Sequence, residues 1–286
     1  MKIDPYKHRE RYLAWKASLN GKIPKISEEN SKIILEYMLD MEHGLNVASS
    51  SKKGARSYMR LNNLRQRIVY LIKQFEIRYN LINVTQVSER TLHEFFTGMK
   101  NGTVARLDGK TYKSPTDYVK IFKAFWHWHQ KVNRKQGKEI QDITIDLDTS
   151  ADKPEWVYLT EEQVKKLVDN AIYDYKVMIM FLYDSGIRAP TELLNIKVSD
   201  FFNNFKELNI RDEISKTFGR RIKLMLCSDF VKEYVKNKGL KPDDYLFSKQ
   251  PNVMNRYLQR LANRILGDAV SPAGQKYSEL TLYDFR

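Results

Sequence analysis

The second half of the sequence contains arginines in positions suited to phosphate binding. Arg188 follows Ser185 and Gly186, a pair typical of a helix end, and so lies in a tight turn between helices. A guanidinium group presents paired donors in one plane, which suits the oxygens of a phosphate or a carboxylate. The ordinary alternative is a structural ion pair between Arg188 and Glu192, and these residues taken alone favour the ion pair, since structural ion pairs are common.

Three motifs in a fixed order resemble those of the tyrosine recombinases. The run DSGIRAPTELL at 184–194, with Asp200 after it, resembles the first arginine motif of that family. Lys216 lies between two strand-like runs, where the family has its catalytic lysine. The run LYDFR at 282–286 resembles the family's His-x-x-Arg segment, with Tyr283 in the histidine position. A tyrosine in this position resembles the pattern of integrases of archaeal mobile elements. The order and spacing of the motifs carry the resemblance.

The resemblance implies a metal-independent enzyme that cuts and rejoins DNA through a 3′-phosphotyrosine, in site-specific integration and excision. Its expected substrate is a double-stranded DNA attachment site, and its expected assembly is a tetramer in the synaptic complex. No cofactor and no metal are expected. Two alternatives stay open, a noncatalytic DNA-binding regulator on the same scaffold and a type IB topoisomerase-like enzyme.

The family's catalytic roles carry over to individual residues. Arg188 and Arg286 are expected to hold the non-bridging oxygens of the scissile phosphate. Lys216 is expected to protonate the departing 5′ oxygen, with Lys223 as the less favoured substitute. Glu192 is expected to orient Arg188, because a carboxylate next to the phosphate would oppose DNA binding.

The nucleophile of the family follows its second arginine motif, whereas this sequence stops at Arg286. Tyr277 and Tyr283 precede that arginine or lie within its motif, so neither is expected to attack the phosphorus. Tyr283 is expected to donate a hydrogen bond, since a phenol is a poor proton acceptor near neutrality, or else to pack beside Asp284 and Phe285. The 286-residue chain is therefore expected to bind DNA without cleaving it.

Helical periodicity dominates the first half and predicts a helical core-binding domain over 1–140. Apolar residues recur on one face of the segments 27–41, 58–79, 88–99 and 115–135. A basic, Ser-rich loop at 49–56 precedes the second of these helices. The residues expected to bind DNA here are Lys52, Lys53, Arg56 and Arg60.

Periodicity fails over 141–156, which predicts a linker before a catalytic domain at 157–286 that is truncated ahead of the nucleophile. Thr160 and Gln163 form a capping box at the start of its first helix. Arg220 and Arg221 are expected to bind DNA. Strand-like runs at 207–211 and 220–226 lie among helical segments, which indicates an α+β domain. The predicted fold class is mainly α with a small β-sheet, a helical core-binding domain followed by an α+β catalytic domain of the tyrosine-recombinase type.

The composition favours a polyanionic partner, with solubility alone as the ordinary alternative. There are 49 Lys and Arg against 35 Asp and Glu, a formal charge of +14, and 42% of residues are hydrophobic, as packed domains require. Cys227 is the only cysteine, which excludes an internal disulfide and a multi-cysteine zinc site, and its apolar surroundings predict a core thiol. Because no apolar run has the length of a membrane span and no signal peptide is evident, a soluble, cytoplasmic protein is expected.

Overall fold

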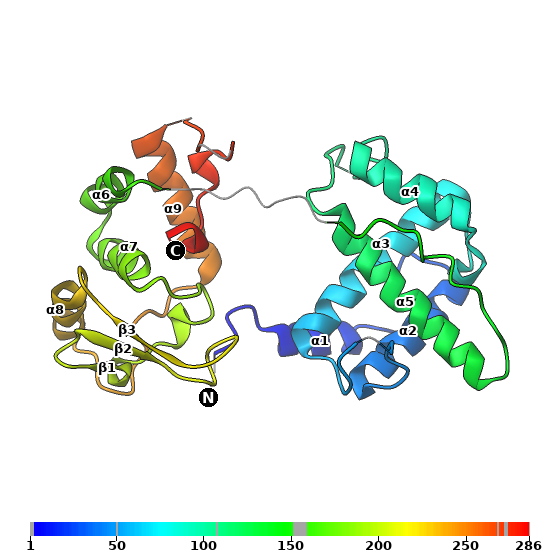
Figure 1. Ribbon diagram of the computed structural model, residues 1–286, viewed down its shortest axis with the longest axis horizontal. Helices are drawn as coiled ribbons and strands as arrows, with labels where there is room; N and C mark the ends of the chain where they lie inside the picture. The colour runs from blue at the N-terminus through cyan, green and yellow to red at the C-terminus, as the bar shows by residue number, and fades with distance from the viewer. Residues whose placement is uncertain are drawn as a thin grey trace. The chain divides into compact units, whose positions relative to one another are not determined.

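The computed structural model describes residues 3–49, 51–106, 108–150, 159–267, 269–271 and 274–285. These residues form two compact units (Figure 1). Residues 7–150 make up the helical unit, and residues 3–6 together with 159–285 make up the α+β unit. Within the described ranges, no helix has the length and hydropathy needed to cross a bilayer.

The helical unit is built from helices with sequence-encoded starts. Ser27, Ser57 and Ser88 each precede a helix, and each side chain accepts a hydrogen bond from the backbone N–H three residues later. The α-helices in its described part are α1 (His8–Ala17), α2 (Glu28–His43), α3 (Tyr58–Tyr79), α4 (Glu89–Asn101) and α5 (Pro115–Lys135), and η1 (Val84–Gln86) is a 3-10 turn. Both α3 and α5 have the predicted bounds, whereas α1 was not predicted.

The long helix α3 lies at the centre of the helical unit. It contacts α1, α2 and α5, and its Leu64, Ile68 and Phe75 are fully buried. Phe75 packs against Phe122 of α5 at a ring-centroid distance of 5.8 Å. Full burial of one such side chain contributes about 1.5–3 kcal/mol to folding, so this row of contacts fixes α3 in the unit.

The predicted linker at 141–156 begins too early. Trp126 Nε1 donates to the carbonyl oxygen of Gln141 at 3.0 Å, and Asp142 pairs with His127 at 3.0 Å. Leu147 is buried in the core of the helical unit. Residues 141–150 therefore belong to the helical unit, because their side chains and carbonyl groups complete its core, and 151–158 lie outside the described residues.

The α+β unit combines helices with a small antiparallel sheet. Its strands have the order β1-β2-β3, and Leu208 of β2 lies opposite Phe201 on one side and Ile222 on the other. The described elements are α6 (Glu161–Asn170), α7 (Tyr173–Ser185), η2 (Leu193–Asn195), η3 (Val198–Asp200), β1 (Phe201–Phe202), β2 (Glu207–Ile210), β3 (Arg220–Lys223), α8 (Ser228–Lys238), α9 (Pro251–Leu266), η4 (Tyr277–Glu279) and η5 (Leu282–Phe285).

The apolar helix α7 contributes much of the core of the α+β unit. Val177, Ile179 and Phe181 are fully buried, and α7 contacts α6 and α8 (Figure 1). Asp184, near the end of α7, accepts the backbone N–H groups of Leu226 and Cys227 at 2.8 and 2.9 Å, where α8 begins. The thiol of Cys227 is buried, as predicted.

The first residues of the chain belong to the α+β unit and not to the predicted 1–140 domain. The buried side chain of Asn195 accepts the N–H of Ile3 at 2.6 Å and donates to the Ile3 carbonyl oxygen at 3.0 Å. These two bonds satisfy the peptide groups of an extended segment, which explains why residues 3–6 are held there.

Candidate functional site

Arg188 lies in the turn after α7. Gly186, with a φ of 56°, ends α7 in the left-handed conformation, and the buried Ile187 holds the turn against the core. The backbone N–H of Arg188 donates to Oε2 of Glu192 at 2.8 Å, and Nη1 of Arg188 donates to Oε1 at 3.2 Å. Glu192 therefore fixes both the backbone and the guanidinium group of Arg188.

Glu192 also binds a second arginine. Nη1 and Nη2 of Arg220, on β3, donate to the two carboxylate oxygens at 3.1 and 2.8 Å. Burial raises the pKa of the Glu192 carboxyl, but hydrogen bonds from Arg220 and from the backbone of Arg188 outweigh burial and hold that pKa below its ordinary value. The ionised carboxylate and two guanidinium groups leave one net positive charge.

Arg188 retains donors for a ligand. Of its guanidinium nitrogens, only Nη1 contacts Glu192 in the described part of the chain, and 28% of the side chain is exposed. Arg220 uses both terminal nitrogens on Glu192. A phosphate oxygen can therefore bind the exposed edge of Arg188 while Glu192 holds the guanidinium group in place.

The two arginines grouped together in the sequence have different surroundings. The Arg220 side chain meets Glu192, whereas the Arg221 side chain is 67% exposed, with its guanidinium carbon 5.3 Å from the centre of the Phe202 ring. Successive side chains of a strand point to opposite faces. Because Arg220 and Arg221 are adjacent in a predicted strand, the sequence already indicated that their side chains have different surroundings.

Lys216 lies in the loop between β2 and β3 and is exposed, without a hydrogen bond or ion pair to the described residues. The loop closes where the N–H of Gly219 donates to Oδ1 of Asp212 at 2.6 Å. A Cβ at Gly219 would lie 2.7 Å from the Ile210 carbonyl oxygen, so this close approach requires glycine. Lys223 is exposed on β3, in register with Glu207. Of the two lysines, only Lys216 is on a loop that can present an ammonium group to a strand of DNA.

The C-terminal motif is described only in part. Tyr283 is 39% exposed in η5, between Leu282 and Phe285 of the core, and Arg286 lies outside the described residues. Tyr277 is 4% exposed, and its hydroxyl accepts a hydrogen bond from Nε2 of Gln163 at 2.9 Å. Tyr277 is thus a core residue that closes α6 against the C-terminal segment.

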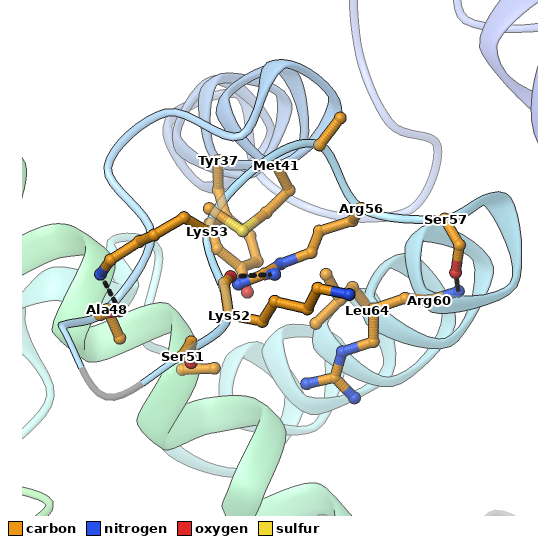
Figure 2. A pocket seen from close by; sticks show the side chains of 12 residues that line it. Tyr37, Met41, Ala48, Ser51, Lys52, Lys53, Arg56, Ser57, Arg60 and Leu64 are labelled. Carbon is orange, nitrogen blue, oxygen red and sulfur yellow. Dashed lines mark hydrogen bonds between the residues drawn. The ribbon is translucent and has the colours of Figure 1, made fainter. Parts of the chain in front are cut away.

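The four cations predicted to bind DNA in the first half line one pocket of about 490 Å³ (Figure 2). Figure 2 shows Arg60 on α3 and Lys52, Lys53 and Arg56 on the loop that precedes it. Nζ of Lys53 donates to the carbonyl oxygens of Ala48 and Ser49, and Nη1 of Arg56 donates to that of Lys52 at 2.6 Å. Within the described chain, no carboxylate pairs with any of the four cations, so their charges remain uncompensated.

Three cations of α5, missed in the sequence, lie beside a second pocket of about 610 Å³. Ala48 lines both pockets, so they adjoin. The three cations are Lys131, Arg134 and Lys135. Arg134 and Lys135 follow Lys131 by three and four residues, a spacing that places them on one face of a helix and could have been recognised in the sequence. No group of three His, Cys, Asp or Glu side chains in the described ranges is arranged to hold a metal ion.

No protein-family model and no curated protein matches the chain, but solved structures do. The Tn1549 transposon integrase (residues 82–397), in complex with circular intermediate DNA, has a TM-score of 0.60 at 16% identity, over 91% of this chain and 84% of that chain. XerH site-specific recombinase bound to difH substrate, a pre-cleavage complex, has a TM-score of 0.55 at 18% identity, over 100% of this chain and 85% of that chain. XerH bound to a palindromic difH substrate, a post-cleavage complex, has a TM-score of 0.54 at 16% identity, over 97% and 83%.

What these proteins share with the chain, at 16–18% identity, is the fold. The likeness confirms the predicted combination of a helical part with an α+β part that has a small sheet. The chain therefore has the fold of the tyrosine recombinases and integrases.

Proposed function

We propose that the chain acts in site-specific DNA recombination. In this proposal Arg188 holds the phosphodiester that is cut, and the basic pocket of the helical unit binds duplex DNA. The observation that carries the proposal is the guanidinium group of Arg188, which the buried Glu192 holds through Nη1 while 28% of the side chain stays exposed. The Tn1549 integrase structure is described as a complex with circular intermediate DNA, and the XerH structures are described as bound to difH substrate, which supports DNA as the partner.

The chemistry exchanges one phosphodiester bond for another. The phenolic oxygen of a tyrosine attacks the phosphorus as its proton leaves to water, the bond to the 5′ oxygen breaks, and the 3′ side of the strand becomes a phosphotyrosine. Arg188 and Arg286 stabilise the charge that develops on the non-bridging oxygens. Lys216 gives its proton to the departing 5′ oxygen, and Lys223 is the less favoured donor. Because the new phosphodiester keeps the energy of the old one, a 5′ hydroxyl can reverse the step and rejoin strands.

The tyrosines of the C-terminal segment have other tasks in this proposal. Tyr277 is buried with its hydroxyl bound to Gln163, and Tyr283 acts as a hydrogen-bond donor near the phosphate. The 286-residue chain then binds DNA without cutting it. Recombination joins two duplexes, so the proposed assembly is a tetramer on paired attachment sites. We also propose that the protein acts in the cytoplasm.

The test is a binding selection from a pool of random duplexes, followed by ethylation interference on the selected sequence. We expect an enriched inverted repeat, because chains related by a two-fold axis read identical half-sites. Ethylation of one phosphate in each half-site should weaken binding of the wild type but not of Arg188→Gln. A pool without any enriched sequence would refute site-specific recombination.

A noncatalytic DNA-binding regulator on the same scaffold is the second candidate, because the four cations of the basic pocket, which have no carboxylate partner among the described residues, would serve it equally well. A regulator also selects a sequence, so the selection alone does not separate the two. In a regulator the phosphate near Arg188 has no special status. If ethylation weakens binding of Arg188→Gln at the same phosphates and to the same degree as binding of the wild type, this second function is favoured.

A further inference from the structure

Tyr37 has a buried hydroxyl in the wall of the basic pocket. Its side chain is fully buried, and its ring packs against Phe125 and Trp128 at centroid distances of 5.4 and 5.2 Å. The hydroxyl has no hydrogen-bond partner among the described residues. A buried donor left unsatisfied costs about 1–3 kcal/mol, so its retention needs an explanation.

The surroundings of this hydroxyl suit an anion. Figure 2 shows Tyr37 and Met41 on α2 facing the loop that carries Arg56. Burial raises the pKa of the Tyr37 phenol, while Arg60 and Arg56 lie near enough to act in the opposite direction. The phenol therefore stays a donor near two guanidinium groups.

The start of α3 adds further positive potential. Ser57 is the N-cap and accepts the N–H of Arg60, and both residues line the pocket. The first turn of α3 has no acidic side chain. The backbone N–H groups at a helix N-terminus carry a partial positive charge, which stabilises a bound phosphate.

We propose that this pocket binds one phosphate group of a DNA strand, with the Tyr37 hydroxyl as its innermost hydrogen-bond donor. Four cations exceed what a single phosphate neutralises, so Lys52 and Lys53 are placed for the neighbouring phosphates of the same strand. This excess favours a polyanion over free phosphate. The assignment to DNA rests on the proposed function, whereas the phosphate site itself does not.

The proposal predicts opposite effects of one substitution on stability and on binding. Tyr37→Phe removes the unsatisfied hydroxyl, so the free protein should be as stable as the wild type or more stable. The same change removes a donor to a charged ligand, so affinity for phosphate and for duplex DNA should fall by about tenfold. The salt dependence of duplex binding should not change, because no charge is lost.

Tyr112→Phe is the matched control. Tyr112 is also a buried tyrosine of the helical unit, but its hydroxyl is 2.7 Å from that of Tyr70, and it does not line the pocket. Loss of the Tyr112 hydroxyl should lower the stability of the protein and leave the affinities for phosphate and for duplex DNA unchanged.

The experiment uses the full chain in three arms. Amide chemical shifts of an isotope-labelled sample report inorganic phosphate binding, fluorescence anisotropy reports binding to a 30-base-pair duplex, and thermal unfolding reports stability. Wild type, Tyr37→Phe and Tyr112→Phe are compared in each. Weaker binding of both ligands by Tyr37→Phe, without loss of stability, supports the site.

The remaining outcomes each count against the proposal. Unchanged affinities, or a loss of stability like that of Tyr112→Phe, would make Tyr37 a packing residue. A loss of phosphate affinity with unchanged duplex affinity would assign the site to free phosphate. If the wild type binds no duplex but still binds phosphate through Tyr37, the proposed function and the DNA assignment both fail, and only a phosphate site remains.

Discussion

The candidate phosphate site of the α+β unit and the basic pocket of the helical unit hold their arginines in different ways. In the α+β unit, Arg188 and Arg220 share the buried carboxylate of Glu192. In the helical unit, Arg56 and Arg60 line a pocket with two lysines, and no carboxylate of the described chain pairs with them. The first arrangement fixes a guanidinium group in one orientation, and the second leaves a positive charge for a ligand to neutralise.

This difference separates positioning from affinity. The carboxylate that orients Arg188 also neutralises part of the positive charge of Arg188. This loss matters little where the reaction rate depends on the orientation of the guanidinium group. Uncompensated cations on long side chains release counterions when they meet a polyanion, which is how duplex affinity arises. Substitutions in the two regions should therefore change different quantities.

The largest expected effect concerns Lys216, which belongs to neither arrangement. In an assembly that cleaves DNA, Lys216→Ala should slow strand cleavage by about 10²–10⁴-fold and leave DNA affinity nearly unchanged, because a general acid acts only in the transition state. A substrate with a 5′-bridging sulfur needs little protonation and should restore the rate. If it does not, Lys223 becomes the candidate acid.

Glu192→Gln should destabilise the α+β unit by about 3 kcal/mol, because two arginines lose their shared counter-ion. Cys227, the only cysteine, is buried in that unit, so its alkylation in increasing urea reports unfolding there. Glu94→Gln on α4, which breaks an exposed ion pair with Arg90, is the control and should not change the alkylation of Cys227. Equal effects of the two substitutions would show that Glu192 does not hold the arginines.

The contribution of Glu192 should depend on pH. Its carboxyl has a pKa below the ordinary value when the unit is folded, so the charged form is favoured by folding. The stability that this charge supplies is present above the unfolded pKa of about 4.3 and is lost as the pH falls through the lower, folded value. The stability difference between wild type and Glu192→Gln should therefore be constant from pH 5 to 7. Below pH 5 this stability difference should decrease as the pH falls. A difference that increases as the pH falls would show that the charge on Glu192 opposes folding.

Local patterns predicted what local interactions determine. Tyr58–Tyr79 was predicted with its bounds because Ser57 caps it and its apolar stripe is continuous. The cations of 52–60 were predicted as a group because they follow one another along a loop and the first turn of a helix. Glu192 was predicted as a partner of Arg188 because a carboxylate next to the phosphate would oppose DNA binding.

Contacts between distant residues were missed. Arg220 reaches Glu192 from a strand 28 residues away, and Asn195 binds Ile3 across 192 residues. The helix α1 buries only Tyr12 among its ten residues, too little for a periodic signal. Tyr37 looked like an ordinary core position of α2, and only the tertiary structure places its hydroxyl beside the basic loop.

Tyr283→Phe should have a smaller effect. In a cleaving form of the protein, loss of one donor near the phosphate should slow cleavage by about tenfold, with folding and DNA affinity retained. Single-turnover cleavage of Tyr283→Phe and Tyr283→His provides the measurement. Wild-type rates for the Phe variant, with a destabilised His variant, would make Tyr283 a packing residue beside Leu282 and Phe285.

Arg60→Gln should have the smallest effect. It removes one uncompensated charge from the pocket, so duplex affinity should fall severalfold and the slope of log affinity against log salt should decrease by about 0.9. Arg90→Gln, which removes one charge from the exposed pair on α4, is the charge-matched control. Equal losses of duplex affinity in the two variants would mean that binding depends only on the net charge of the protein and that the pocket is not a DNA-binding site.

The most direct test of DNA binding by this chain is the affinity of the wild type for duplex DNA over a series of salt concentrations. We expect measurable binding at low salt and a log–log slope of about −4 or steeper, since four uncompensated cations line one pocket and three more line the adjoining one. An affinity that is unmeasurable at low salt, or that does not change with salt, would contradict it.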